Sequence, residues 1–205
     1  MNGSRFAGGI LAVAALGTII AMAFHPSDAH AAGTAAVVHS SMIVLLLAMG
    51  WGFVQFAASR GVWGGWVSAG LVAYAASVFA HVLAGTINGF VVPALLDPAA
   101  PVSHDIFRFA WQLNQALAKF GMIAASAAYL LWAVDLWRRD GDSLLAATGS
   151  AIGVAVPVLL LSGLVKLDVH GALLLYGLHA LWAIMVGVAM ARGRVQSSAT
   201  AATSS

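Results

Sequence analysis

Six long apolar stretches alternate with short polar segments along this chain of 205 residues. They cover residues 6–24, 37–58, 66–91, 107–137, 143–165 and 171–191. An α-helix of about 20 apolar residues crosses the hydrocarbon core of a bilayer, and each stretch is close to or above this length. The pattern predicts an all-α integral membrane protein, a bundle of six transmembrane helices forming one domain over residues 1–195. Residues 196–205, rich in Ser, Ala and Thr, are expected to form a disordered cytoplasmic tail.

The amino-acid composition is typical of an integral membrane protein. Hydrophobic residues make up 61% of the chain and charged residues only 8%, and all seven acidic residues are Asp. The polar-faced, ion-paired helices of a soluble α-protein are therefore missing. Cysteine is absent, which excludes disulfides, thiolate metal sites and cysteine nucleophiles. The basic residues are spread over the ends of the spans rather than gathered in one run, so nucleic acid is not an expected partner.

The basic residues fall mainly on one side of the predicted membrane. Six of the nine flank the same ends of the spans, namely Arg5, Arg60, Arg138, Arg139, Arg192 and Arg194. By the positive-inside rule this side is cytoplasmic, with both termini inside, as in a multi-pass protein of a bacterial-type inner membrane. Four tryptophans fall near the same side, as expected of an aromatic belt: Trp63, Trp66, Trp132 and Trp137.

The first span has a second interpretation. Arg5, the apolar stretch and the small-residue pattern Ala29-His30-Ala31 also fit a secretory signal peptide with its cleavage site. The apolar run of about 19 residues exceeds the 7–15 of a typical signal peptide. A retained transmembrane helix is therefore the expectation, and cleavage would leave five spans with the same orientation.

Two features concern helix contacts and the outer face. Gly85 to Gly89 and Gly149 to Gly153 have the Gly-x-x-x-Gly spacing that permits close helix packing, either within the chain or in a homo- or hetero-oligomer. The connection 92–106 contains Pro93, Pro98 and Pro101, which disfavour helix. It is expected to cross the outer face, as a cap over a cavity or as an ordinary connector.

Two histidines lie within the membrane, where an unpaired polar group is costly and therefore points to function. His81 and His179 are predicted at similar depth in the outer half of the bundle and facing its interior. Lys119 approaches the same layer, and Arg108 lies above it. Two neutral imidazoles from separate helices suit the axial positions of a b-type haem, with Lys119 or Arg108 neutralising a propionate.

The other five histidines are predicted at the outer surface. They are His25 and His30 in the first outer loop, and His39, His104 and His170, each at the outer start of a descending span. Convergence of the last three would form a nitrogen-rich copper or zinc site. His25 or His30 would supply a fourth ligand, and Asp105 and Asp168 would orient the ligands.

The sequence leaves the function open among several classes. Besides a b-type haem or quinone-linked redox protein and a copper or zinc protein, His81 or His179 could exchange a proton beside a lipid, a quinone or a transported solute. The structural alternative is that both hydrogen-bond across helices while the outer histidines lie in water. Motifs of zinc peptidases, serine hydrolases and P-loop proteins are absent from the sequence. The lipid bilayer and a lipophilic small molecule remain the expected partners.

Overall fold

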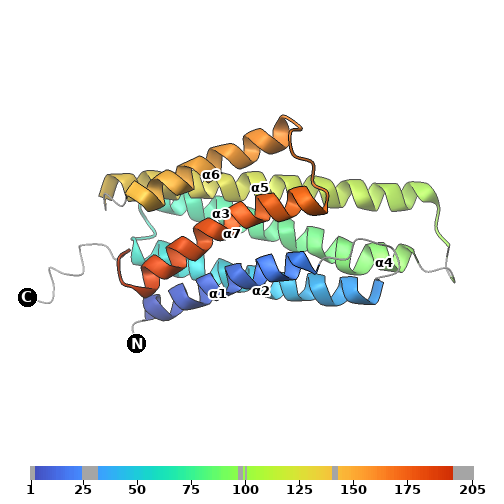
Figure 1. Ribbon diagram of the computed structural model, residues 1–205, viewed down its shortest axis with the longest axis horizontal. Coiled ribbons are helices and arrows are strands. Elements are labelled where there is room, and N and C mark those ends of the chain that lie inside the picture. Colours follow the sequence, from blue (N-terminus) through green and yellow to red (C-terminus); the bar gives the residue numbers. More distant parts are fainter. Residues whose placement is uncertain (1–2, 25–31, 97–98, 100, 140–142, 196–205) are drawn as a thin grey trace, which may run out of the picture.

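The computed structural model describes residues 3–24, 32–96, 99, 101–139 and 143–195, and these form helices and turns without strands (Figure 1). The elements are α1 (Gly3–Ala23), α2 (Ala32–Ser59), α3 (Gly65–Thr86), the π-helical segment η2 (Ile87–Val91), α4 (Val92–Leu95), α5 (His104–Arg139), α6 (Ser143–Leu161) and α7 (Val169–Ala191). Six of the described helices are long and apolar enough to cross a membrane, with α3, η2 and α4 counting as one continuous span. The predicted six-helix membrane bundle is therefore confirmed.

The third span continues further than its sequence indicated. Helix was expected to end near residue 91, before Pro93, but it runs on through η2 and α4 to Leu95. Proline has no N–H to donate, and its ring clashes with the carbonyl four residues earlier. That carbonyl belongs to Gly89, which lies inside the π-helical segment. The wider π-helical turn thus lets the helix continue past Pro93 instead of ending there.

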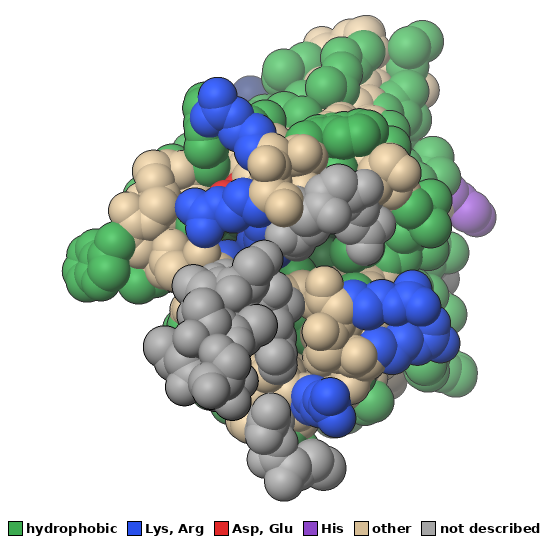
Figure 2. All heavy atoms as spheres, turned by 90° about the vertical axis from the view of Figure 1, so that its left-hand side faces the viewer, with side chains coloured by type: hydrophobic (Ala, Val, Ile, Leu, Met, Phe, Trp, Pro, Cys, Tyr) green, Lys and Arg blue, Asp and Glu red, His purple; other side chains and the backbone are tan. Residues whose placement is uncertain are grey.

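The helices run mostly along the long axis of the molecule (Figure 1). Helix α1 packs against α2 and α7, α3 packs along α5, and α5 also contacts α6. The beginning of α1 and the end of α7 lie at one end of the bundle, and α5 extends beyond its neighbours at the other end (Figure 1). Lys and Arg side chains gather on the first of these two ends, which we call the basic end (Figure 2).

Glycines allow the helices to approach closely within the chain. A Cβ added to Gly8 of α1 would lie 2.5 Å from the carbonyl oxygen of Gly187 of α7, so the two backbones nearly touch. The predicted Gly-x-x-x-Gly motifs are likewise used internally. Gly89 packs against His39, and Gly149 and Gly153 pack against side chains of α7 and α5. These contacts join helices of one chain, and they account for both motifs without an oligomer.

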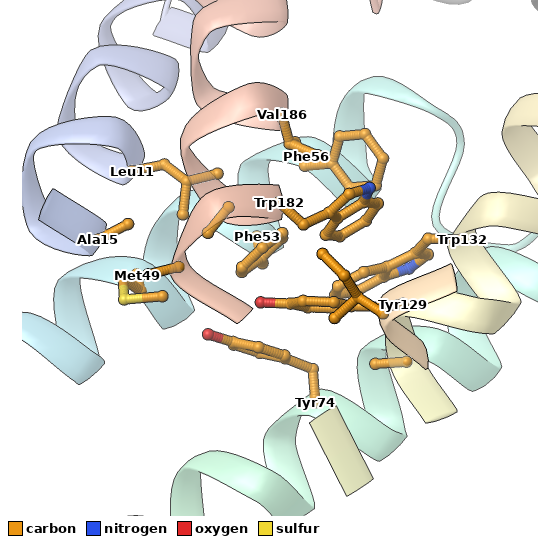
Figure 3. Packing of buried hydrophobic residues seen from close by; sticks show 14 of the residues in the cluster. Leu11, Ala15, Met49, Phe53, Phe56, Tyr74, Tyr129, Trp132, Trp182 and Val186 are labelled. Atoms are coloured by element: carbon orange, nitrogen blue, oxygen red, sulfur yellow. The ribbon is translucent and has the colours of Figure 1, made fainter. Parts of the chain in front are cut away.

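A layer of aromatic side chains fills the middle of the bundle (Figure 3). It consists of Phe53 and Phe56 of α2, Tyr74 of α3, Tyr129 and Trp132 of α5, and Trp182 of α7. The ring centroids of Phe53 and Trp132 are 5.0 Å apart, and those of Tyr129 and Trp182 are 4.2 Å apart. Trp132 was expected in the interfacial belt, but it is fully buried and donates its indole N–H to the carbonyl of Val67, 3.2 Å away. This shared aromatic core holds four helices together.

A buried ion-pair cluster closes the basic end. Asp135 of α5 accepts hydrogen bonds from Nε of Arg60, which follows α2, and from Nε of Arg139 at 2.8 Å. Arg139 also donates to the backbone carbonyl of Arg60 at 2.9 Å. Asp135 and Arg60 are 2% and 1% exposed, so their charges are almost completely removed from solvent. The cluster ties the end of α2 to the end of α5.

Candidate functional site

A cavity of about 320 Å³ lies in the half of the bundle away from the basic end. It is bordered by α1, α2, α3, α5 and α7, and Tyr74 and Tyr129 of the aromatic layer form part of its wall. Its volume falls within the range of small-molecule pockets, about 300–1,000 Å³. Most of the wall is apolar. The polar side chains in it are Thr18, His39, Tyr74, Ser77, His81, Asn88, Asn114, Gln115, Tyr129, Asp168, Tyr176 and His179, together with the indole of Trp111.

His39 is held in the cavity wall with both ring nitrogens engaged. Its Nδ1 lies 2.8 Å from the backbone carbonyl of Ala35, one turn earlier in α2, and its Nε2 lies 3.1 Å from the amide nitrogen of Asn88. A carbonyl only accepts, so Nδ1 carries the proton and Nε2 accepts from the amide. Gly89 makes room for the ring, because a Cβ there would lie 2.6 Å from Cβ of His39. The π-helical segment thus supplies both the hydrogen-bond donor and the space.

His81 lies in the cavity wall with one ring nitrogen unpartnered. Its Nδ1 is 3.2 Å from the hydroxyl of Ser77, one turn earlier in α3. Its Nε2 is buried and has no hydrogen-bond partner among the described residues. The ring lies against Gly121 of α5, where an added Cβ would come within 2.6–2.8 Å of three ring atoms, and beside the ring of Tyr176 at 5.3 Å. An unpaired buried polar atom costs about 1–3 kcal/mol, so this nitrogen requires an explanation.

His179 borders the same cavity from α7. Its Nε2 lies 2.9 Å from the hydroxyl of Ser126, a fully buried residue of α5. Tyr129 donates its hydroxyl to the backbone carbonyl of His179 at 3.2 Å, and the two rings meet edge to face at 5.2 Å. His179 is therefore fixed to α5 by its ring and by its backbone. The two intramembrane histidines of the sequence analysis do face one common interior space.

The two cations predicted beside these histidines lie elsewhere. Lys119 and Arg108 are both exposed on α5, and neither borders the cavity. Their depth along the helix was read from the sequence, but the rotation of α5 turns both side chains outward. Among the described residues of the wall, Asp168 is the one charged side chain. Its carboxylate accepts the N–H of Gly171 at 2.9 Å as the N-cap of α7.

The predicted outer metal site is not assembled by the described residues. His104 and His170 are exposed at the starts of α5 and α7, whereas His39 is buried with both nitrogens engaged. No group of three His, Asp, Glu or Cys side chains in the described part of the chain is placed to hold a metal ion. His25 and His30, proposed as further ligands, lie outside the described residues. Asp105 is exposed, and the Asp168 carboxylate already caps α7.

Several residues of the cavity wall were not singled out from the sequence. Ser77 precedes His81 by four residues, which places both on one helix face and was a readable signal. The tyrosines and Asn88 carried no such signal, because their role depends on contacts between helices. Asn114 and Gln115 of α5 also border the cavity.

Chemically, the site is an apolar chamber whose hydrogen-bonding groups are uncharged apart from the carboxylate of Asp168. Imidazole, phenol, hydroxyl and carboxamide groups can donate to or accept from a neutral ligand, whereas the described wall offers no cation to an anionic one. The comparisons with known proteins add no family: the chain matches no protein-family model, no curated protein and no solved structure. The chemistry of the cavity is therefore the basis for a functional hypothesis.

Proposed function

We propose that this membrane protein binds a neutral lipophilic small molecule with a hydrogen-bonding head group, of the quinone type, in the cavity between α2, α3, α5 and α7. The apolar wall favours a lipophilic ligand, and its few polar groups can fix the orientation of a head group. The unpartnered Nε2 of His81 carries the proposal. A carbonyl or hydroxyl oxygen of a ligand would satisfy this nitrogen once a small rotation of the imidazole presents it to the cavity.

A b-type haem is supported less well. His179 would have to give up its hydrogen bond to Ser126 if Nε2 is the ligating atom, and the His81 ring would have to leave its place against Gly121. Lys119 and Arg108 do not border the cavity and so do not neutralise propionates there. A copper or zinc site has still less support, because His39 already uses both nitrogens. A quinone, by contrast, requires a rotation of the His81 imidazole but leaves the hydrogen bond between His179 and Ser126 in place.

Quinone binding would fit a role in quinone-linked redox, and a cavity of this kind would equally serve a protein that carries or transports a lipophilic molecule.

The orientation in the membrane is part of the same proposal: the basic end faces the cytoplasm and the cavity lies toward the outer, periplasmic-type face. Six arginines at the ends of α1, α2, α5 and α7 support it. Single cysteines introduced into this cysteine-free chain test it, because an impermeant thiol reagent should label residue 103 in intact cells and residue 194 only after permeabilisation. The reverse labelling would overturn the orientation.

Binding is tested with the protein in lipid nanodiscs, by titrating decylubiquinone and recording tryptophan fluorescence. Trp111 borders the cavity and Trp182 packs against Tyr129 in its wall, so a bound quinone should quench their fluorescence saturably. Ala118→Phe should fill the cavity and weaken binding about tenfold, equivalent to about 1.4 kcal/mol. Ala116→Phe, the same change at an exposed position of the same helix, should leave binding unchanged.

The outcomes separate the candidates. Quenching that never saturates, or that Ala118→Phe and Ala116→Phe change equally, would overturn binding in the cavity. A b-type optical spectrum after expression with added haem, abolished by His81→Ala and by His179→Ala, would replace the quinone by a haem.

A further inference from the structure

A second hollow lies on the outside of the bundle, along the seam between α2 and α3. It is an open groove of about 470 Å³. Its wall is apolar and includes Leu47, Gly50 and Trp51 of α2 and Ala75, Val78 and Phe79 of α3. Leu47, Trp51, Ala75 and Phe79 are exposed, and both helices are membrane spans, so this groove faces the lipid.

A single layer of side chains separates the groove from the cavity. Tyr74 borders both spaces. Sequence neighbours on the two helices face opposite sides of the same wall: Leu46 borders the cavity and Leu47 the groove, and Ser77 borders the cavity and Val78 the groove. The cavity and the lipid-facing groove therefore lie on opposite sides of the same wall, which α2 and α3 form.

Tyr74, which lies between the cavity and the groove, has one polar group in its side chain, the hydroxyl. The Tyr74 ring lies nearly parallel to that of Tyr129, with an interplanar angle of 12° and centroids 6.4 Å apart, and the two hydroxyls point to the same side (Figure 3). Gly50 contributes no side chain to the groove, and a Cβ added there would make ordinary van der Waals contact with Val78, at 3.7 Å. Among the described residues, Tyr74 is the one side chain that borders both spaces, and the ring of Phe53 packs against it with centroids 4.6 Å apart.

We infer that the ligand of the cavity carries an apolar tail, which lies in the α2–α3 groove while the head group lies among the polar residues inside, and that the molecule passes between α2 and α3 beside Tyr74. This inference rests on the proposed function and adds the class of ligand and its route: an isoprenoid- or alkyl-chained molecule taken directly from the bilayer. The tail is assigned to the groove because the groove is apolar, opens to lipid and shares the Tyr74 wall with the cavity.

Two probes and two variants of one helix test the tail. The probes are decylubiquinone and the same benzoquinone without its decyl chain, titrated against the protein in nanodiscs. Ala75→Phe fills the groove, and Ala69→Phe makes the same change at another exposed position of α3 outside it. Ala75→Phe should weaken binding of decylubiquinone about tenfold and leave the tail-less quinone unchanged, whereas Ala69→Phe should change neither. Comparing variants for each probe separately cancels the stronger partition of the decyl compound into lipid.

The results distinguish failure of this inference from failure of the proposed function. If both quinones bind the wild type and Ala75→Phe affects neither, bulk lipid occupies the groove and the inference is overturned while the cavity site stands. If Ala75→Phe instead converts a dimer into a monomer without a selective loss of decylubiquinone, a second copy occupies the groove and the inference is likewise overturned. If neither quinone binds the wild type saturably, the proposed function itself fails.

Discussion

Asp135 and His81 are both polar residues in the interior of apolar helices, and their surroundings differ sharply. Asp135, near the basic end, accepts hydrogen bonds from Arg60 and Arg139 on its two carboxylate oxygens, and Arg60 also lies over the ring of Phe56 in the aromatic layer. His81, beside the cavity, has one nitrogen bonded to Ser77 and the other unpartnered in the described part of the chain. One region is packed and saturated with hydrogen bonds. The other is hollow and incompletely bonded.

The difference separates structural polar groups from candidates for function. A buried charge without partners is too costly to retain, so a carboxylate in the interior requires a complete set of counter-ions. A neutral imidazole costs only about 1–3 kcal/mol when one nitrogen is unpaired, which a folded protein can tolerate. Incomplete bonding next to empty space is the pattern expected of a binding site before its ligand arrives. Matched substitutions in the two regions should therefore differ in their cost to stability, most at the ion-pair cluster and least in the cavity wall.

The ion-pair cluster should be the more sensitive region. Asp135→Asn keeps the shape of the side chain but leaves Arg60 buried without its counter-ion, and breaking such a pair costs about 3–5 kcal/mol. Asp105→Asn, at an exposed position on the same helix, should cost less than about 1 kcal/mol. The measurement is the free energy of unfolding in mixed micelles with increasing SDS, followed by circular dichroism. Equal losses for the two variants would remove the structural role assigned to the cluster.

The same leucine substitution should cost less beside the cavity than in the packed region. Leu136→Ala, at a fully buried position of α5, should destabilise the protein by about 2–5 kcal/mol, because it leaves a new void among close-packed atoms. Leu46→Ala should cost less than half as much, because its side chain borders space that is already empty and has fewer contacts to lose. The same SDS titration measures both. A cost at Leu46 equal to that at Leu136 would mean that this half of the bundle is as tightly packed as the other.

The sequence was sufficient for the spans and for the basic end, because apolar length and the position of arginines are properties of the chain read in one dimension. It also indicated that His81 and His179 face the bundle interior, where both border the cavity. It did not supply the rotation of each helix about its axis. Lys119 shares the predicted layer but is exposed, and Trp132 was assigned to the interface but is fully buried. In a helix that is apolar on nearly every face, the hydrophobic pattern does not mark which face is inside.

Long-range partners account for the other differences. Arg139 lies four residues after Asp135, a spacing that predicts contact, but Arg60 is 75 residues away in the sequence and its role could not be read from the chain. His39 was expected at the outer surface, at the start of its span. Helix α2 begins earlier, at Ala32, so His39 lies about two turns inside it and meets Asn88 of the π-helical segment. That segment depends on how the helix accommodates Pro93, a detail of backbone geometry.

His39 and His81, two of the histidines of the cavity wall, should respond unequally to the same substitution. His39→Leu removes the acceptor of Asn88 and leaves that amide unsatisfied in the interior, so it should cost about 1–3 kcal/mol of unfolding free energy. His81→Leu breaks the hydrogen bond to Ser77 but also removes a nitrogen that has no partner in the described part of the chain, so the two effects offset and stability should change by less than about 1 kcal/mol. Quinone quenching in nanodiscs should be lost in His81→Leu despite its intact fold. Loss of stability without loss of binding in this variant would make His81 a packing residue, and the head group would then have to be held by other residues of the wall.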